Sequence, residues 1–282
     1  MPWQTLGTPA PDQLAHTREQ LHCVAQVVAS VPRSLATPQD DWSHHSFQWD
    51  AQRQALLGAE IPSGNNFRAG VRVADGTAII VAADGSEVAA QPAHGLAIDD
   101  LFAWLTEQVT ALTGAPPPKP LIEVEDGLPE PCAAGQRFDL GDTPALAEIA
   151  RYYENSHAVL QQIVASHDNA APVRTWPHHM DMATLISLDP GADPETARSV
   201  SFGMQPGDGF YAEPYYYSSP WPYPEAGAEP ALSGGGAWRT EGFTAAVLVA
   251  SNLVDAGDAT EQEQALDAFA RSAIEGNQTL LS

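Results

Sequence analysis

The sequence predicts an α+β protein made of two similar halves, each an antiparallel sheet with helices on one face. Three observations lead to this class: apolar residues recur at helical spacing near both ends of each half, strand-like runs lie between them, and a Trp-x-His-His element occurs twice. The repeat further predicts an internal duplication with a pseudo-twofold axis.

Four segments carry the apolar spacing of a helix. The first begins near Asp12, a suitable N-cap, and the second follows the pair Asp99-Asp100 and ends at Gly114. We expect Gly276 to end the fourth helix. The apolar positions of the four helices are Leu14, Leu21, Val24, Ala25, Val28 and Val31; Leu101, Phe102, Leu105, Val109 and Leu112; Leu146, Ile149, Ala150, Tyr153, Leu160, Ile163 and Val164; and Leu266, Phe269, Ala270, Ala273 and Ile274.

Strand-like runs lie between the helices of each half. In the first half they cover 46–51, 55–61, 67–74 and 77–83, and in the second half 173–188, 199–204, 213–219 and a run near Trp238. A proline-rich and acidic passage separates the halves. We therefore predict a first half at 1–114, a linker at 115–142, and a second half at 143–282.

The repeated element reads Trp42-Ser43-His44-His45 in the first half and Trp176-Pro177-His178-His179 in the second. Both copies follow a helix whose end reads alike, Val27-Val28-Ala29-Ser30 and Ile163-Val164-Ala165-Ser166. With seven Trp and nine His in the chain, chance predicts far fewer than one such element. If the halves are duplicated, His45 corresponds to His179.

Composition limits the classes of partner. Apolar residues make up 44% and charged residues 17%, which is typical of a folded chain. A net charge of −24 opposes nucleic acid and anionic membrane surfaces, and there is no apolar run of about 18 residues. The first residues lack the features of a signal peptide. Cys23 and Cys132 form no disulfide framework, so we expect reduced cysteines and a cytoplasmic protein.

The second Trp-x-His-His copy opens the segment with the richest chemistry. Taken as one strand from Trp176 to Ile186, it places His179, Asp181, Ala183 and Leu185 on one face. The other face carries Trp176, His178, Met180, Met182 and Ile186, so we expect His178 to be a buried core histidine. An imidazole and a carboxylate on one face can share a metal ion or move a proton.

Tyrosines dominate a later segment. Four of the seven lie between Tyr211 and Tyr217, after a Pro206-Gly207-Asp208-Gly209 turn signal. By strand alternation Glu213, Tyr215 and Tyr217 share a face and Tyr216 lies on the other. The segment suits either the wall of an amphipathic ligand pocket or an aromatic sheet edge packed under a loop.

A third segment, 234–243, joins a glycine run to Trp238, Arg239 and Glu241. The run lacks the Lys-Ser/Thr of a phosphate loop, and the nucleotide, hydrolase and metalloprotease motifs are missing, so we expect no nucleotide cofactor. Glu241 is either a ligand or general base, or an ion-pair partner of Arg239.

At these residues the chain resembles an uncharacterised bacterial protein family. Members of that family carry the blocks Trp-Pro-His-His-Phe-Asp, Pro-Gly-Asp with Glu-Pro-Tyr, and Trp-His-Thr-Glu-Gly, which here read 176–181, 206–208 with 213–215, and 238–242. The resemblance covers mainly the second half, and Arg239 replaces the histidine of the family block. It supports the choice of residues and implies no reaction.

Two hypotheses follow. The one we favour is an enzyme acting on a small molecule, metal-dependent or acid–base, with His179, Asp181 and Glu241 as catalytic residues and Tyr215, Tyr217, Arg239 and Trp238 binding the substrate. A divalent ion (zinc, manganese, iron or nickel) would be held by His179, Asp181, Glu213 and His45. The alternative is a non-catalytic module that binds an aromatic or sugar-like ligand through its tyrosines, with structural histidines.

Overall fold

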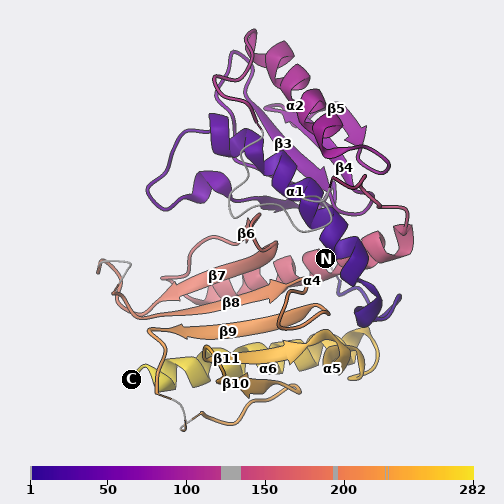
Figure 1. Cartoon of the computed structure of the whole chain (residues 1–282). Helices are drawn as coiled ribbons and strands as arrows, with labels where there is room; N and C mark the ends of the chain where they lie inside the picture. The colour runs from indigo at the N-terminus through magenta and orange to yellow at the C-terminus, as the bar shows by residue number, and fades with distance from the viewer. Residues whose placement is uncertain (1, 122–134, 193–195, 226, 228) are drawn as a thin grey trace. The chain divides into compact units, whose positions relative to one another are not determined.

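The computed structural model describes residues 2–121, 135–192, 196–225, 227 and 229–282. It is an α+β fold with two antiparallel sheets, as the sequence predicts (Figure 1). Contacts divide the chain into two compact units. The first unit contains residues 14–150 and 174–180; the second contains 1–13, 151–173 and 181–282.

The predicted boundaries at 114 and 143 differ from this division. Residues 1–13 belong to the second unit because Trp3 and the backbone of Leu6 bond to Gln262, at 3.3 and 2.9 Å. The end of the predicted linker is part of the first unit. Phe138 and Leu140 are buried, and the Leu140 N–H donates to His94 Nδ1. Positions 122–134 of the predicted linker lie outside the described residues.

The first unit has a consecutive sheet order, β1-β2-β3-β4-β5. Its elements are α1 (Ala15–Leu35), η2 (Ser43–His45), β1 (Gln48–Asp50), β2 (Ala55–Leu57), β3 (Phe67–Arg72), β4 (Thr77–Ala82), β5 (Glu87–Pro92) and α2 (Ile98–Thr113). Helix α2 ends at Gly114 in a left-handed conformation, as predicted. Strand β5 is missing from the prediction because it is an exposed edge strand of Glu, Val, Ala, Gln and Pro.

The second sheet has the order β10-β11-β9-β8-β7-β6. Its strands are β6 (Arg174–Trp176), β7 (Asp181–Ser187), β8 (Ser199–Gln205), β9 (Tyr215–Trp221), β10 (Ala237–Arg239) and β11 (Ala245–Val249), and β6 groups with the first unit by its contacts. The helices are η1 (Pro11–Gln13), α4 (Thr143–Ser166), α5 (Ala250–Val254) and α6 (Ala259–Leu280); the boundary between the units falls inside α4.

Helix α6 covers one face of the second sheet (Figure 1). Phe202 packs on Phe269 with ring centroids 6.0 Å apart, and Asn277 donates to Ser218 Oγ at 2.8 Å. The helix continues through Gly276, so the stop predicted there is wrong. Gly276 serves packing instead, because a Cβ at this position would lie 3.2 Å from the Trp238 ring.

The two sheets differ in strand order. The first is consecutive throughout, whereas in the second β11 pairs with β9 and the earlier strand β10 lies outside it. A duplication would give both sheets the same strand order, and the orders agree only over the first four strands of each sheet. The internal duplication is therefore not confirmed.

Cys23 is disulfide-bonded, which corrects the expectation of a reduced thiol. The only other cysteine of the chain, Cys132, lies outside the described residues. Because disulfides persist mainly in oxidising compartments, the cysteines no longer support a cytoplasmic location. Among the described residues, no helix is both long enough and apolar enough to cross a bilayer.

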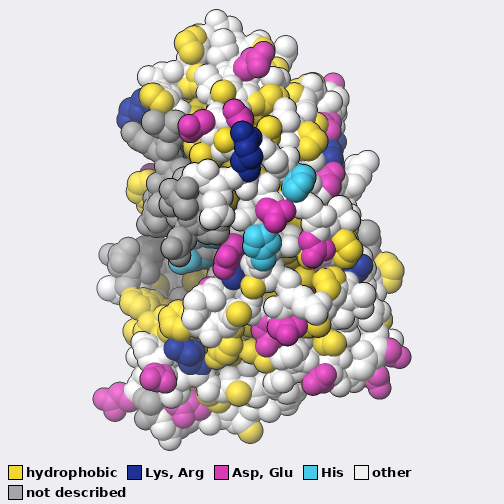
Figure 2. Space-filling model, turned by 45° about the vertical axis from the view of Figure 1, so that its right-hand side comes forward, with side chains coloured by type: hydrophobic (Ala, Val, Ile, Leu, Met, Phe, Trp, Pro, Cys, Tyr) yellow, Lys and Arg dark blue, Asp and Glu magenta, His cyan; other side chains and the backbone are white. Residues whose placement is uncertain are grey.

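Acidic side chains are spread over the face of the molecule drawn in Figure 2, and basic ones are sparse on it. This distribution accords with the 36 acidic and 12 basic residues of the sequence. Such a surface repels polyanions in general, so any positive patch is a local feature.

Candidate functional site

The Trp-Pro-His-His segment is a turn. Strand β6 ends at Trp176, and the N–H groups of His179 and Met180 both donate to the Trp176 carbonyl, at 3.2 and 2.7 Å. Met180 has a left-handed φ of 61°, and β7 begins at the next residue. The single strand predicted from Trp176 to Ile186 is therefore wrong, because Pro177 has no N–H to donate to a sheet ladder.

This turn changes the placement of both histidines. His179 is exposed, and His178 is half-buried, not the nearly buried core residue expected from strand alternation. The alternation holds only from Met180 onward, where Met180, Met182 and Ile186 are buried. His179 lies in the turn and Asp181 is the first residue of β7, so strand alternation does not place the two side chains on one face.

A third histidine anchors the turn to helix α1. His22 Nε2 lies 2.9 Å from the Pro177 carbonyl oxygen, and as an N–H it donates to it. Burial lowers the pKa of His22 to about 4, with a smaller contribution from the charges of Arg18 and His179. His22 is therefore neutral near pH 7 and holds the turn in place.

The first Trp-x-His-His copy is a 3-10 turn in the same unit. Trp42 is left-handed at φ 58°, and η2 follows it. His44 is buried, and its Nδ1 accepts the Gln39 N–H at 3.1 Å. The two copies run side by side, because Phe47 and Thr175 exchange backbone hydrogen bonds of 2.8 and 2.9 Å.

The polar cluster of the second unit lies on the sheet face opposite α6. Tyr217 donates its hydroxyl to Asp181 Oδ2 at 2.7 Å, and Tyr215 donates to Asp208 Oδ2 at the same distance. Tyr216 points to the helix side and accepts a bond from Ser156 at 3.1 Å. The alternation predicted along this strand is confirmed. We call Asp181, Asp208, Tyr211, Tyr215 and Tyr217 the tyrosine face.

Gly203 makes room for the Tyr217–Asp181 pair. It lies between Ala183 of β7 and Tyr217 of β9 in the sheet register. A Cβ at Gly203 would lie 2.8 Å from both Ala183 Cβ and the Tyr217 hydroxyl. The phenol ring therefore crosses β8 above this glycine to reach the carboxylate on β7.

The tyrosines of β9 are held in the neutral form. Burial raises the pKa of Tyr215, Tyr216 and Tyr217 above the usual value, and the neighbouring carboxylates raise it further at Tyr215 and Tyr217. Their hydroxyls are hydrogen-bond donors near pH 7. This arrangement favours ligand positioning over base catalysis.

Gln205 lies between the two Tyr–Asp pairs. In the sheet Gln205 pairs with Tyr215 of β9. The preceding residue, Met204, pairs with Met182 of β7 on the other side of β8. Gln205 is 5% exposed, and its Oε1 has no hydrogen-bond partner among the described residues. Gln205 is absent from the site residues predicted from the sequence, although a glutamine that ends an apolar strand is a polar signal at a buried position.

Arg239 contacts two phenylalanine rings at the edge of this cluster. Its guanidinium carbon lies 4.5 Å from the centroid of the Phe210 ring and 5.0 Å from that of Phe243. Its Nε is buried without a partner among the described residues. Phe243 and Tyr211 pack on the apolar patch of Tyr215, Ala245 and Val247.

Three other predicted site residues lie elsewhere. Glu213 accepts the N–H and hydroxyl of Ser251, at 2.6 and 3.0 Å, and so caps α5. Trp238 donates to the Pro230 carbonyl on the helix side of the sheet. Glu241 is exposed in the bend after β10, where strand alternation with Arg239 has ended.

Within the part of the chain that the structure describes, no group of three or more His, Cys, Asp or Glu could hold a metal ion. The predicted set of His179, Asp181, Glu213 and His45 is therefore not assembled as a metal centre. Glu213 does not join this set because its carboxylate caps α5.

Comparison of the chain with protein-family models, with curated proteins and with solved structures finds no match. The resemblance to a bacterial family stays a prediction, and the choice of site depends on the geometry.

Proposed function

We propose that the second unit is a binding module for a small, neutral, hydroxyl-bearing ligand of the sugar-like kind, held on the tyrosine face. The observation that carries the proposal is the buried Oε1 of Gln205, which has no donor among the described residues. An unsatisfied buried acceptor costs about 1–3 kcal/mol, and a ligand hydroxyl would remove that cost.

The surroundings of Gln205 suit such a ligand. Carboxylate oxygens of Asp181 and Asp208 lie on the same face and are acceptors. Tyrosine rings offer flat apolar area beside polar tips, which is the combination that sugar-like rings require. The net charge of −24 disfavours an anionic ligand at this face.

A binding role is favoured over acid–base or metal chemistry by the state of the other polar groups. His22 and His44 are hydrogen-bonded to backbone atoms, and the raised pKa of Tyr217 makes it a poor base at neutral pH. A stoichiometric divalent ion in protein purified without a histidine tag would contradict this preference and favour the enzyme hypothesis.

The test is calorimetric titration with glucose, galactose, mannose and N-acetylglucosamine. We compare the wild type with Gln205→Leu, which keeps the approximate size but removes the acceptor. The matched control is Tyr216→Phe, on the opposite face of the adjacent strand. We expect at least one sugar to bind the wild type and the control, and binding to Gln205→Leu to be at least tenfold weaker. Lack of binding by every sugar, or equal binding by Gln205→Leu, would overturn the proposal.

A further inference from the structure

A cleft of about 250 Å³ lies in the first unit beside η2. Its wall includes Arg68 of β3, Arg174 of β6, His44 of η2, and Glu60. The whole chain has 12 basic residues, so two arginines in one small cleft concentrate positive charge in an acidic protein. The residues that line this cleft belong to the first unit, whereas the tyrosine face belongs to the second.

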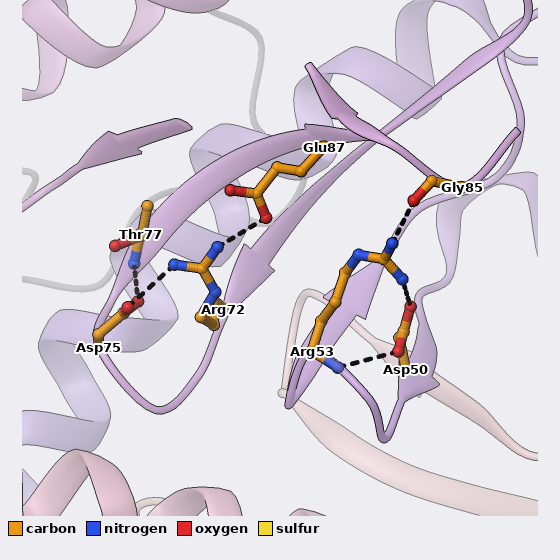
Figure 3. Close-up of polar contacts among 7 residues, drawn as sticks. All are labelled: Asp50, Arg53, Arg72, Asp75, Thr77, Gly85 and Glu87. Carbon is orange, nitrogen blue, oxygen red and sulfur yellow. Dashed lines mark hydrogen bonds and ion pairs between the residues drawn. The ribbon is translucent and has the colours of Figure 1, made fainter. Parts of the chain in front are cut away.

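Arg68 differs from the other arginines of its sheet. Arg72, four residues along β3, is bonded to Asp75 at 3.0 Å and to Glu87 at 2.6 Å (Figure 3). Arg53 is bonded to Asp50 at 2.6 Å and to the Gly85 carbonyl (Figure 3). These two guanidinium groups are neutralised by their neighbours.

Arg68 has no carboxylate partner among the described residues. Its Nη1 donates to the Gly58 carbonyl at 3.0 Å, with a long contact of 3.5 Å to Gln48 Oε1. Those two bonds use one nitrogen. The Nε and Nη2 atoms, which form the edge that binds a carboxylate through two parallel bonds, are unpaired within the described chain.

His44 supplies a second donor. Only 6% of the residue is exposed, and because Nδ1 accepts the Gln39 N–H, the ring hydrogen of the neutral form is on Nε2. No described residue accepts that hydrogen. His44 and Arg68 therefore both line the cleft, and each has a hydrogen-bond donor without a partner among the described residues.

The remaining charges bear on which anion fits. Arg174 is 3.4 Å from Asp41, whose pKa is lowered mainly by hydrogen bonds from Ser43 and less by Arg174 itself. Arg174 is thus partly neutralised, and Glu60 adds a negative charge to the wall. A singly charged ligand is favoured over a dianion. With about 30 Å³ per water, 250 Å³ corresponds to about eight water molecules, which sets the size of the ligand.

We propose that this cleft binds a small organic monocarboxylate, with the Nε–Nη2 edge of Arg68 as the anchor and His44 Nε2 as a second donor. Neither contact requires rearrangement of a bond already made in the structure. Glu60 discriminates against phosphate, which is partly a dianion at neutral pH.

The test titrates the protein with sodium acetate, benzoate and inorganic phosphate at constant ionic strength, following tryptophan fluorescence. Trp42 is 62% exposed with its ring centroid 5.9 Å from that of His44, so occupancy of the cleft should change its emission. We expect saturable binding of at least one carboxylate, tighter than phosphate, and at least tenfold weaker binding by Arg68→Gln.

Arg72→Gln is the matched control, since it removes the same charge from the same strand but leaves the cleft unchanged. Its affinity should equal that of the wild type. Equal weakening by both variants would indicate general electrostatics and overturn the proposal, as would tighter binding of phosphate or no saturable binding. Thermal unfolding of each variant confirms that it is folded.

Discussion

Both sheets bury a small apolar patch on the face opposite their helices, and polar side chains border each patch. In the first unit the patch is Ala55, Leu57, Ile79 and Val81, and in the second it is Tyr215, Ala245 and Val247. Ion pairs of Arg53 and Arg72 border the first patch, whereas tyrosine hydroxyls bonded to aspartates border the second.

This difference indicates which of the two sheet faces is suited to binding a ligand. The ion pairs of the first unit satisfy one another, and among the described residues Arg68 is the arginine of β3 that has no carboxylate partner. The tyrosine face uses neutral donors and retains an unpaired acceptor at Gln205. Polar groups bordering an apolar patch point to binding only where a hydrogen bond is left unmade.

The largest expected effect is a loss of folding stability at high pH, which comes from the tyrosines of β9 and not from the ion pairs of the first unit. A group with a raised pKa in the folded state stabilises the fold below its unfolded pKa, and that stability is lost as pH rises above it. For Tyr215, Tyr216 and Tyr217 the loss begins near pH 10 and reaches roughly 3–4 kcal/mol by pH 11. Urea unfolding between pH 8 and 11 measures it.

Lysine titration contributes little to the change in stability at alkaline pH, because the chain has a single lysine, Lys119. Tyr217→Phe should reduce the pH dependence by about one third if the three tyrosines contribute equally. Constant stability up to pH 11 would show that the fold does not raise the pKa of the β9 tyrosines. It would therefore contradict the difference between the two faces.

The next effect compares one glycine from each face. A Cβ at Gly70 would lie 2.6 Å from the rigid Leu56 carbonyl oxygen, and one at Gly203 would lie 2.8 Å from the Tyr217 hydroxyl. We expect Gly70→Ala to cost about 3 kcal/mol and Gly203→Ala about 2 kcal/mol in urea unfolding, as overpacking does.

Gly203→Ala should also displace Tyr217 from Asp181 and weaken sugar binding, whereas Gly70→Ala should not change it. Gly209→Ala is the control, because no atom lies within 4 Å of its added Cβ. If Gly203→Ala retains full stability and binding, the assigned path of the Tyr217 ring over β8 is incorrect.

A smaller effect makes the first unit sensitive to acid. His22 has a pKa of about 4 in the fold and about 6.5 when unfolded, so the unfolded state binds more protons between these values. Stability therefore falls as pH drops from 6.5 to 4, by on the order of 2 kcal/mol. His22→Gln, which retains a donor for Pro177, should remove that part of the decrease. An identical pH profile in wild type and His22→Gln would count against the buried, neutral His22.

The smallest effect concerns the ion pairs of Figure 3. Replacing Arg72 by Met should cost about 1 kcal/mol at low salt, and less at 1 M NaCl, because its partners are partly exposed. Arg68→Met should show no comparable salt dependence, since it has no carboxylate partner in the described chain. Similar salt dependence of the two variants would contradict the distinction between them.

The sequence by itself determined the features that depend on local periodicity. It predicted the α+β class, four of the long helices, and the alternation that separates Tyr216 from Tyr215 and Tyr217, because each element must bury one face. It missed β5, an exposed edge strand, and β11, whose short apolar run has no clear period.

Only the tertiary structure decided which polar groups meet. His22 and Pro177 are 155 residues apart, and Tyr217 and Asp181 are 36 apart, so no local pattern links them. The turn at Pro177 removed the strand alternation expected for His178 and His179, and capping of α5 occupied Glu213. Periodicity sets which face a side chain occupies, but its hydrogen-bond partner depends on which distant segment packs beside it.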